Sequence, residues 1–396
     1  MTIKALENKY MLQTYKRFDL QVTRGAGKYL WDTSGKRYLD FFSGISVCNL
    51  GHCNPRVVKA ITAQASKIIH ASNHYYTKPM AEFAAALIES SFDGKVFISN
   101  SGAEANECAI KLARKWGSLH GGKYEIIVFN NSFHGRTMAT LTATGQPKMH
   151  AGFEPLLPGF KYADYNNIES VLKLVNKKTA AIMLEPVLGE GGVVPSDKKF
   201  ITGLRKLCKK NNLLLIFDEV QTGLGRTGRL YAFEHYGVTP DIMSLGKSIA
   251  GGLPLGATVA VPHVASAFSY GDHGSTFGGN PVGCAAAKEV LSQLTPALLK
   301  SVTANGKYLV EKLVRLKGEY PELITQVRGL GLMIGMQINQ PGRDIVQYCQ
   351  DKGLIINCTQ DTVLRFLPPL IINKQDIKTA VKILEDAIKW KISKQL

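Results

Sequence analysis

The sequence predicts an α/β protein in which a mainly parallel sheet is followed by a smaller α+β domain. Between residues 92 and 262, short apolar runs alternate with helical patterns, as they do in repeated strand–helix–strand units. Beyond Asn280-Pro281 the pattern changes to longer helical stretches with isolated strands. Near the N-terminus, extended runs are separated by glycine turns, which is typical of antiparallel strands.

The segment from residue 10 to residue 40 is predicted to form a short antiparallel excursion. A Gly25-Ala26-Gly27 turn separates its first two extended runs, and a Ser34-Gly35 turn precedes the third. The expected strands are Leu20–Thr23, Tyr29–Trp31 and Arg37–Asp40.

The apolar runs of the central region predict the strands of the large sheet, since each run is bounded by Gly, Asn, Pro, Asp or Lys. Open α/β sheets bind their ligands at the carboxyl ends of such strands. The residues that directly follow each run are therefore the first candidates for a functional site. The expected strands are Lys95–Ile98, Glu125–Phe129, Ala180–Leu184, Leu213–Phe217, Ile242–Leu245 and Ala257–Val261.

The C-terminal part is predicted to begin with two helices, over Ala285–Leu294 and Leu298–Leu316. Strands are expected around Gly331–Ile338 and Val363–Leu367. This mixture indicates a second domain of the α+β class.

The chain has 396 residues, of which 45% are hydrophobic and 20% charged, so it is long and apolar enough for a folded protein of enzyme size. Its seven cysteines are scattered and form no CxxC pair, which argues against a disulfide framework or a zinc ribbon. The N-terminus lacks the apolar core of a signal peptide, and no run reaches about 18 apolar residues. We therefore expect a cytoplasmic protein with reduced thiols that does not span a membrane.

The formal net charge is +17, from 48 Lys and Arg against 31 Asp and Glu. Such an excess suits either a nucleic-acid or other acidic partner, or a solvated lysine-rich surface. The basic residues occur as isolated pairs such as Lys177-Lys178 and Lys209-Lys210, without an arginine-rich or aromatic-interleaved run. This favours the lysine-rich surface, and no nucleic-acid partner is expected.

The segment Asn100–Ala105 directly follows a predicted strand and opens a helix. Ser101 is expected to cap this helix, with Glu104 closing a capping box. Gly102 would let a phosphate approach free backbone N–H groups at the positive helix end, although an ordinary capped helix is the alternative. The apolar positions on one face of the helix are Ala105, Cys108, Ala109, Leu112, Ala113 and Trp116.

Two charged residues follow later strands. Asp218 ends the run Leu213–Phe217, where a buried carboxylate needs a cation. A metal is one possible cation, but a metal cage would need a His or further acids nearby, which are lacking, so no metal is expected; a protonated ring nitrogen would serve equally well. Lys247 follows Ile242–Leu245, where burial could lower its pKa enough for imine chemistry, although an ordinary solvated lysine is the alternative. A phosphate cup, an aspartate and a lysine on successive strand ends match what pyridoxal phosphate requires.

Longer motifs carry a family resemblance. Leu214–Gly228 and Pro240–Lys247 look like the signature of the class III aminotransferases. Further motifs resemble the acetylornithine branch of that family in order and spacing, over essentially the whole chain. They are Asn100–Asn106, Phe133–Thr137, Glu185–Pro195, Gly274–Pro281 and Arg328–Leu332.

The resemblance implies a fold type I, pyridoxal-phosphate-dependent enzyme with small-molecule substrates, whose large domain has a mainly parallel sheet of the seven-stranded type. It further implies a homodimer with both active sites at the interface. Three regions are expected: an N-terminal segment (1–50) packing with the small domain, a large cofactor-binding domain (51–295) and a small α+β domain (296–396).

By the same resemblance, Lys247 forms the imine with the cofactor, Asp218 pairs with the ring nitrogen and Gln221 lies near the ring hydroxyl. Phe133 is expected to stack on the ring and Thr276 to reach the phosphate in the partner subunit; their alternatives are plain core packing and a plain turn residue. Backbone groups would hold the phosphate. The other residues expected to bind the cofactor are Ser101, Gly102, Ala103, Glu219 and Val220.

The implied substrates carry carboxylates, which arginine binds best through its planar fork. Arg136 and Arg365 match the substrate arginines of the family, and Ser275 joins Arg136 at the acetylornithine end. Glu190 resembles the residue that pairs with the second arginine until a dicarboxylate displaces it. Ile45 stands where ornithine aminotransferases carry a tyrosine, which favours an acylated α-amine.

The resemblance thus implies interconversion of N2-acetyl-L-ornithine and 2-oxoglutarate with N-acetyl-L-glutamate 5-semialdehyde and L-glutamate, in arginine biosynthesis. Ornithine, succinylated and succinyldiaminopimelate or carrier-linked donors remain alternatives, because relatives acting on them share nearly all these motifs. Decarboxylation or racemisation with the same cofactor is an alternative reaction. A basic binding protein without catalysis comes from a different class, and the intact Lys247, Asp218 and Gln221 argue against it. Arg114, Arg226 and Arg229 are expected to be structural.

Overall fold

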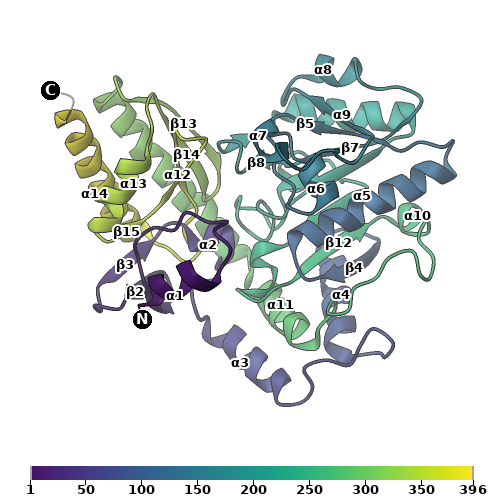
Figure 1. Cartoon of the computed structure of the whole chain (residues 1–396), viewed down its shortest axis with the longest axis horizontal. Helices are drawn as coiled ribbons and strands as arrows, with labels where there is room; N and C mark the ends of the chain where they lie inside the picture. Colours follow the sequence, from purple (N-terminus) through teal and green to yellow (C-terminus); the bar gives the residue numbers. More distant parts are fainter. Residues whose placement is uncertain (1, 395–396) are drawn as a thin grey trace.

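The computed structural model describes residues 2–394, and its elements form two parts (Figure 1). The middle of the chain builds a large sheet with its covering helices, on the right of the view. Both ends of the chain, purple and yellow, lie in the smaller part on the left. No helix of residues 2–394 combines the length and apolarity needed to cross a bilayer.

In spatial order, the strands of the large sheet are β4 (Lys95–Ser99), β12 (Gly256–Ala260), β11 (Ile242–Leu245), β10 (Leu214–Asp218), β7 (Thr179–Leu184), β5 (Glu125–Phe129) and β6 (Phe160–Ala163). Neighbours from β11 to β6 are parallel, whereas β12 is antiparallel to both of its neighbours. The predicted mainly parallel sheet is therefore confirmed. The short edge strand β6 was not predicted, because its run contains an exposed lysine.

Both faces of the sheet are buried, as the continuous apolar runs require. Ile126 and Val128 of β5 pack in the core beneath α5 (Gly102–Leu119), whereas Ile127 and Phe129 pack in the core on the opposite face. All six apolar positions predicted for the inner face of α5 are buried. The remaining elements of this part are α3 (Pro55–Ala65), α4 (Lys78–Ser90), α6 (Met138–Ala143), α7 (Pro147–His150), α8 (Ile168–Leu172), β8 (Val187–Leu188), β9 (Val194–Pro195), α9 (Lys198–Asn211), η1 (Ala232–His235), η2 (Lys247–Ala250), α10 (Pro262–Ala265) and α11 (Pro281–Gln293).

The parallel register brings the polar strand ends to one edge. Phe217 pairs with Leu184, and Asp218 pairs with Ser244. Glu185, Asp218 and Lys247 therefore follow neighbouring strands on the same side of the sheet. This is the edge at which open α/β sheets bind ligands.

The N-terminal strands β1 (Val22–Ala26), β2 (Tyr29–Asp32) and β3 (Arg37–Asp40) follow α1 (Ile3–Tyr10) and precede the turn α2 (Ser43–Ser46). β3 agrees with its prediction, but β1 continues through Gly25, where a turn was expected. Gly25 instead lets the β1 backbone lie close to the His52 side chain, because a Cβ at residue 25 would lie 2.8 Å from the Cβ of His52. β3 pairs in parallel with β15 (Leu354–Ile355), so both ends of the chain share one sheet. The domain boundaries after residues 50 and 295 stay predictions.

The smaller part also contains an antiparallel sheet of β13 (Ile324–Leu330), β14 (Met333–Ile338), β17 (Val363–Phe366) and β16 (Asn357–Thr359) in that order. Its helices are α12 (Pro296–Glu319), α13 (Arg343–Asp351) and α14 (Lys374–Ser393). β13, α13 and α14 were not predicted, and Gly331 forms the β13–β14 turn rather than a strand start. α11 starts earlier than predicted, because Asn280 caps it and Pro281 occupies its first position.

The packing of α12 against the β13–β14 turn gives a test of this architecture. A Cβ on Gly306 would lie 2.1 Å from the Gly331 carbonyl oxygen, whereas a Cβ on Gly318 of the same helix meets nothing within 4 Å. Gly306→Ala should lower the free energy of unfolding by at least about 2 kcal/mol, because backbone must move. Gly318→Ala should leave it unchanged or raise it by up to about 1 kcal/mol. Denaturant unfolding measures both; equal effects would contradict this packing.

Candidate active site

Three glycine-rich backbone segments meet at the carboxyl edge of the large sheet. A Cβ on Gly102 would lie 2.6 Å from Val220 Cγ1, and a Cβ on Gly246 would lie 2.9 Å from Gly102 Cα. The first turn of α5, the segment after β10 and the residue before Lys247 are therefore in direct contact. The three motifs singled out in the sequence thus belong to one site.

Ser101 caps α5 as predicted, accepting a hydrogen bond from Glu104 N at 3.1 Å. The Glu104 carboxylate accepts from Asn100 N rather than from Ser101 N, so the predicted capping box closes one residue further back. The first N–H groups of a helix have no acceptor within it. Those of Gly102 and Ala103 are available for an anion at the positive end of α5.

Asp218 is buried and receives three hydrogen bonds. Asn106 Nδ2 and His134 Nδ1 each donate to Asp218 Oδ2 at 2.7 Å, and Val220 N donates to Oδ1 at 3.0 Å. These donors hold the carboxylate in one orientation. Asn106 Oδ1 and His134 Nε2 are buried and have no hydrogen-bond partner.

Lys247 is the first residue of η2 and has a left-handed backbone, with φ of 46°. This conformation is uncommon outside glycine and often marks functional sites. Burial lowers the pKa of Lys247. The negative charges of Glu190, Asp218 and Glu185 act in the opposite direction but offset this shift only in part. The amine thus feels the charges of three carboxylates, yet it is easier to deprotonate than an ordinary lysine.

Glu185 directly follows β7. Its carboxylate accepts from Phe133 N at 2.9 Å and from Gly189 N at 3.0 Å. Burial raises the pKa of Glu185, the Asp218 charge adds to this, and His134 acts in the opposite direction. Glu185 therefore connects the Phe133 loop to the loop after β8.

Arg365 and Glu190 form the ion pair expected from the sequence. Arg365 Nη1 lies 2.6 Å from Glu190 Oε1; the arginine side chain is 1% exposed and that of the glutamate 26%. Burial alone would raise the pKa of Glu190, but the guanidinium outweighs it and the pKa lies below its ordinary value. Since Lys247 also acts on Glu190, the pair belongs to the same site.

The predicted donor-side residues lie in different places. Ile45 packs with the apolar cluster of Val187, Val193, Met333 and Leu367, next to the segments that carry Glu190 and Arg365. Arg136 is exposed, and its guanidinium carbon lies 5.4 Å from the centre of the partly buried Phe133 ring.

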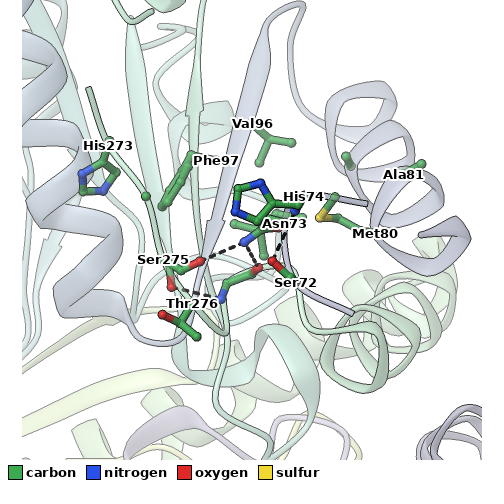
Figure 2. Close-up of a pocket in the computed structure, with 14 residues that line it drawn as sticks. Ser72, Asn73, His74, Met80, Ala81, Val96, Phe97, His273, Ser275 and Thr276 are labelled. Atoms are coloured by element: carbon green, nitrogen blue, oxygen red, sulfur yellow. Dashed lines mark hydrogen bonds between the residues drawn. The ribbon is translucent and has the colours of Figure 1, made fainter. Parts of the chain in front are cut away.

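Ser275 and Thr276 lie at the edge of a pocket of about 690 Å³ (Figure 2). Ser275 Oγ accepts from Asn100 Nδ2 at 3.0 Å, which places it near the start of α5. Asn73 Nδ2 donates to the Ser275 carbonyl at 2.8 Å. Thr276 is exposed and lines this pocket, whereas Lys247 is not among the residues that line it.

Glu219 does not present its carboxylate to the site. The carboxylate accepts from Phe233 N at 2.8 Å and Ala232 N at 2.6 Å, and from the Thr222 hydroxyl at 3.3 Å. These bonds hold η1 against the strand end. The side chain of Glu219 is therefore structural, and only its backbone adjoins the cofactor-binding motif.

Three residues of the site were missed in the sequence: Asn106, His134 and Glu185. Glu185 was detectable, because it directly follows a predicted strand. His134 lies inside the quoted motif Phe133–Thr137, and Asn106 interrupts the apolar face of α5. Their common signal is a polar residue at a position where the pattern predicts burial.

The residues fit pyridoxal phosphate in their donor chemistry. Gln221 Oε1 is buried without a hydrogen-bond partner, as expected of an acceptor for a ring hydroxyl. The start of α5 suits a phosphate, Asp218 suits a protonated ring nitrogen, and Lys247 suits an aldehyde. Within residues 2–394, no group of three or more His, Cys, Asp or Glu side chains is placed to hold a metal ion.

The chain is similar to known transaminases along its whole length. The family model described as aminotransferase class-III matches residues 10–388. The acetylornithine aminotransferase of Methanocaldococcus jannaschii is 52% identical over 386 residues, covering 96% of each chain. The structure of ornithine aminotransferase from Toxoplasma gondii ME49 has a TM-score of 0.95 at 32% identity, covering 99% of this chain and 95% of that one. Acetylornithine aminotransferase from Elizabethkingia anophelis has a TM-score of 0.87 at 35% identity, covering 98% of both.

The structural role of Glu219 can be tested by pH. Burial raises the pKa of Glu219 from 4.5 to about 7. The folded state then binds more protons than the unfolded state between these values, so the Glu219 contribution to stability is full below pH 4.5 and lost as pH rises through 7. In Glu219→Gln, the free energy of unfolding should fall less steeply between pH 4.5 and 7 than in the wild type, by roughly a few kcal/mol over this interval. Urea unfolding at several pH values measures this difference. The variant should still bind the cofactor. An unchanged dependence of stability on pH would contradict the structural role assigned to Glu219.

Proposed function

Because this chain belongs to the class III aminotransferase family, we propose that it transfers an amino group between N2-acetyl-L-ornithine and 2-oxoglutarate. In this reversible reaction, acetylornithine and 2-oxoglutarate are exchanged for N-acetyl-L-glutamate 5-semialdehyde and L-glutamate. The proposed role is arginine biosynthesis, in which the reaction would run in the reverse direction, toward acetylornithine. One observation carries the proposal. Lys247, with its lowered pKa, lies among Asp218, Glu190 and the buried carboxylate-binding arginine Arg365.

The proposed cofactor is pyridoxal 5′-phosphate, which when bound supplies an electron sink for carbanion charge on the substrate carbon. Lys247 would hold its aldehyde, and the first turn of α5 its phosphate. Asp218, fixed by Asn106 and His134, would keep the ring nitrogen protonated. In the acetylornithine half-reaction, the donor amine would first displace Lys247 from the aldehyde. The freed Lys247 amine would then take the proton from Cδ of the donor and return it to the former aldehyde carbon, and a lowered pKa favours the neutral amine that this transfer needs.

The Glu190–Arg365 pair explains how one site can bind two chemically different substrates, an acylated donor and a dicarboxylate. While Glu190 neutralises Arg365, an acylated donor meets no unpaired buried cation at this end. A dicarboxylate such as 2-oxoglutarate or glutamate can replace the Glu190 carboxylate on the guanidinium, with bidentate geometry. The pair therefore acts as a gate for the second half-reaction.

At the donor end we assign the carboxylate to Arg136 and Ser275, and discrimination against free ornithine to Ile45. An apolar side chain offers no hydrogen bond to a free α-amino group, and this supports an acylated donor. Ornithine, succinylated donors and the succinyldiaminopimelate or carrier-linked donors are alternatives. A non-catalytic basic binding protein is disfavoured, since such a protein needs no cluster of Lys247, Asp218 and Gln221.

We further propose a homodimer in which each subunit completes the site of the other through Thr276. Two segments adjacent in sequence to lining residues of the pocket in Figure 2, residues 68–76 and 277–280, expose large apolar side chains, as an interface does. A hydrogen bond joins the segment around Ile69 to the segment around Phe277: Asn280 Nδ2 donates to the Ile69 carbonyl at 2.8 Å. The exposed side chains are Ile68, Ile69, Tyr75, Tyr76 and Phe277. The seven free thiols suit the proposed cytoplasmic location.

The two central charged groups give a first test. Lys247→Ala should remove both the turnover and the visible absorption of the bound cofactor. Asp218→Asn should retain some cofactor but lose most of the rate, because a neutral amide does not favour a protonated ring nitrogen; a loss of about 100-fold or more is expected. Stopped assays of glutamate formation and absorption spectra measure these effects. A near-normal rate in either variant would contradict its assigned role.

Donor preference tests the substrate assignment. With 2-oxoglutarate as acceptor, acetylornithine should exceed ornithine in kcat/KM by at least ~10-fold, and Ile45→Tyr should narrow this ratio. Arg365→Ala should chiefly impair the glutamate and 2-oxoglutarate half-reaction. Glu190→Ala should make glutamate react relatively better, because Arg365 stays open. Equal use of ornithine, or an Arg365→Ala defect confined to the donor half-reaction, would refute the assignment.

A further inference from the structure

The turn α2, which lies between the two parts of the molecule, has an unusual backbone (Figure 1). Ser43, Gly44, Ile45 and Ser46 have φ angles of 46°, 63°, 62° and 64°. Four successive residues are thus left-handed, a conformation that L-residues visit singly and that a β-branched residue such as Ile45 adopts rarely. Such a turn persists only where its surroundings over-determine it.

The start of the turn is held by Asp40 and by a contact with the C-terminal part. Asp40 Oδ1 accepts from Phe42 N at 2.8 Å and from Ser43 N at 2.9 Å. The Ser43 hydroxyl donates to the Leu367 carbonyl. The position of Ser43 is therefore set relative to β17, the strand that carries Arg365.

The end of the turn is held by Arg226, whose side chain is fully buried. Its Nε donates to Ser46 Oγ at 2.8 Å, and its Nη2 donates to Asn49 Oδ1. Its Nη1 donates to the carbonyls of Leu332 at 2.9 Å and Pro368 at 2.7 Å. One guanidinium thus joins the turn α2 to the β13–β14 turn, through Leu332, and to the segment after β17, through Pro368.

Burial lowers the pKa of Arg226 to about 9, although the Asp40 charge opposes this shift, and Arg226 forms no ion pair with a carboxylate of residues 2–394. A buried cation without a carboxylate partner is expensive, and a neutral hydrophobic packing would hold two segments together at lower cost. What the guanidinium specifically supplies is a rigid fork of donors whose acceptors include the turn.

The turn places Ile45 beside the segments that carry Glu190 and Arg365. Ile45 packs against the apolar cluster that contains Val187, Val193 and Leu367. Glu190 lies between the first two in sequence, and Arg365 precedes the third by two residues. A right-handed or extended backbone at residue 45 would direct the side chain elsewhere.

We propose that Arg226 is a positioning residue that fixes the left-handed turn Ser43–Ser46 and so places Ile45 as the wall that selects an acylated donor. This goes beyond the purely structural role expected of Arg226, and it rests on the proposed function for its substrate. Arg226 acts through Ser46 and Asn49 and touches no substrate.

The test uses full-length enzyme with its cofactor, comparing Arg226→Lys, Ser46→Ala and Ile45→Ala with the double variant Ile45→Ala/Arg226→Lys. Arg205→Lys is the matched control, because Arg205 is also a mostly buried arginine, 2.8 Å from Asp241 and outside the site. The acetylornithine-to-ornithine ratio of kcat/KM, the KM for glutamate, and amide hydrogen exchange over residues 43–47 are measured.

Arg226→Lys and Ser46→Ala should each reduce the donor ratio by roughly 3- to 10-fold, mainly through KM for acetylornithine, with faster exchange in the turn. The glutamate KM and the control should change by less than about twofold. The double variant should match Ile45→Ala alone, because both changes act through one side chain. Ser46→Ala decides the outcome if Arg226→Lys does not fold.

Additive effects in the double variant, or an unchanged donor ratio in Ser46→Ala, would overturn the proposal. If the wild-type enzyme shows no preference for acetylornithine, the proposed function fails instead. In that case hydrogen exchange still decides whether Arg226 holds the turn: unchanged exchange in both variants refutes it, and faster exchange than in the control supports it.

Discussion

The site depends on one packing constraint: the first turn of α5 lies against the segments after β10 and β11 with no room for a Cβ on Gly102 or Gly246. This contact places an anion-binding helix end beside Asp218 and Lys247. Asn106, one turn into α5, then reaches Asp218 and links helix and strand by a second, polar contact. Helix end, acid and lysine are thus held as one rigid unit, which is the condition for binding a cofactor in a single orientation.

The buried charges around this unit are mutually compensated. Asp218 is satisfied by three donors, Glu185 by two backbone N–H groups, and Glu190 by Arg365. Lys247 lies among these acids, yet burial still lowers its pKa. Because one compensating pair, Glu190–Arg365, is partly exposed on the glutamate side, it is the pair that an incoming carboxylate can exchange. The arrangement allows a second anion to enter without leaving a buried charge unpaired.

Backbone strain lies where this unit meets the smaller part. Lys247 and the turn Ser43–Ser46 both have left-handed backbones, and the turn α2 contacts η2, which begins at Lys247. The contacts that hold the turn come from three segments: Asp40 precedes it, Arg226 belongs to the large part, and Leu367 directly follows the C-terminal strand β17. The relative placement of the two parts is therefore built into the conformation of the residue that we assign to donor selection.

The sequence alone determined the local elements whose cause is local. Apolar runs predicted six strands of the large sheet, helical spacing predicted the buried face of α5, and Ser101 could be identified as its cap. Motif order determined the family, because residues that meet at strand ends must keep their spacing along the chain. The expectation that Gly25 forms a turn was wrong, since a glycine in sequence does not reveal whether it is needed for φ or for space.

Only the tertiary structure decided which polar groups meet. β12 runs antiparallel, Glu219 turns its carboxylate to η1, and Asn106 and His134 converge on Asp218, all through contacts between segments far apart in sequence. The left-handed turn at Ile45 is the clearest case, because no local propensity favours it and a buried arginine 180 residues away completes its support. Hydrophobic periodicity is local and can be read from a chain, whereas hydrogen-bond partners and strain depend on where the fold places distant groups.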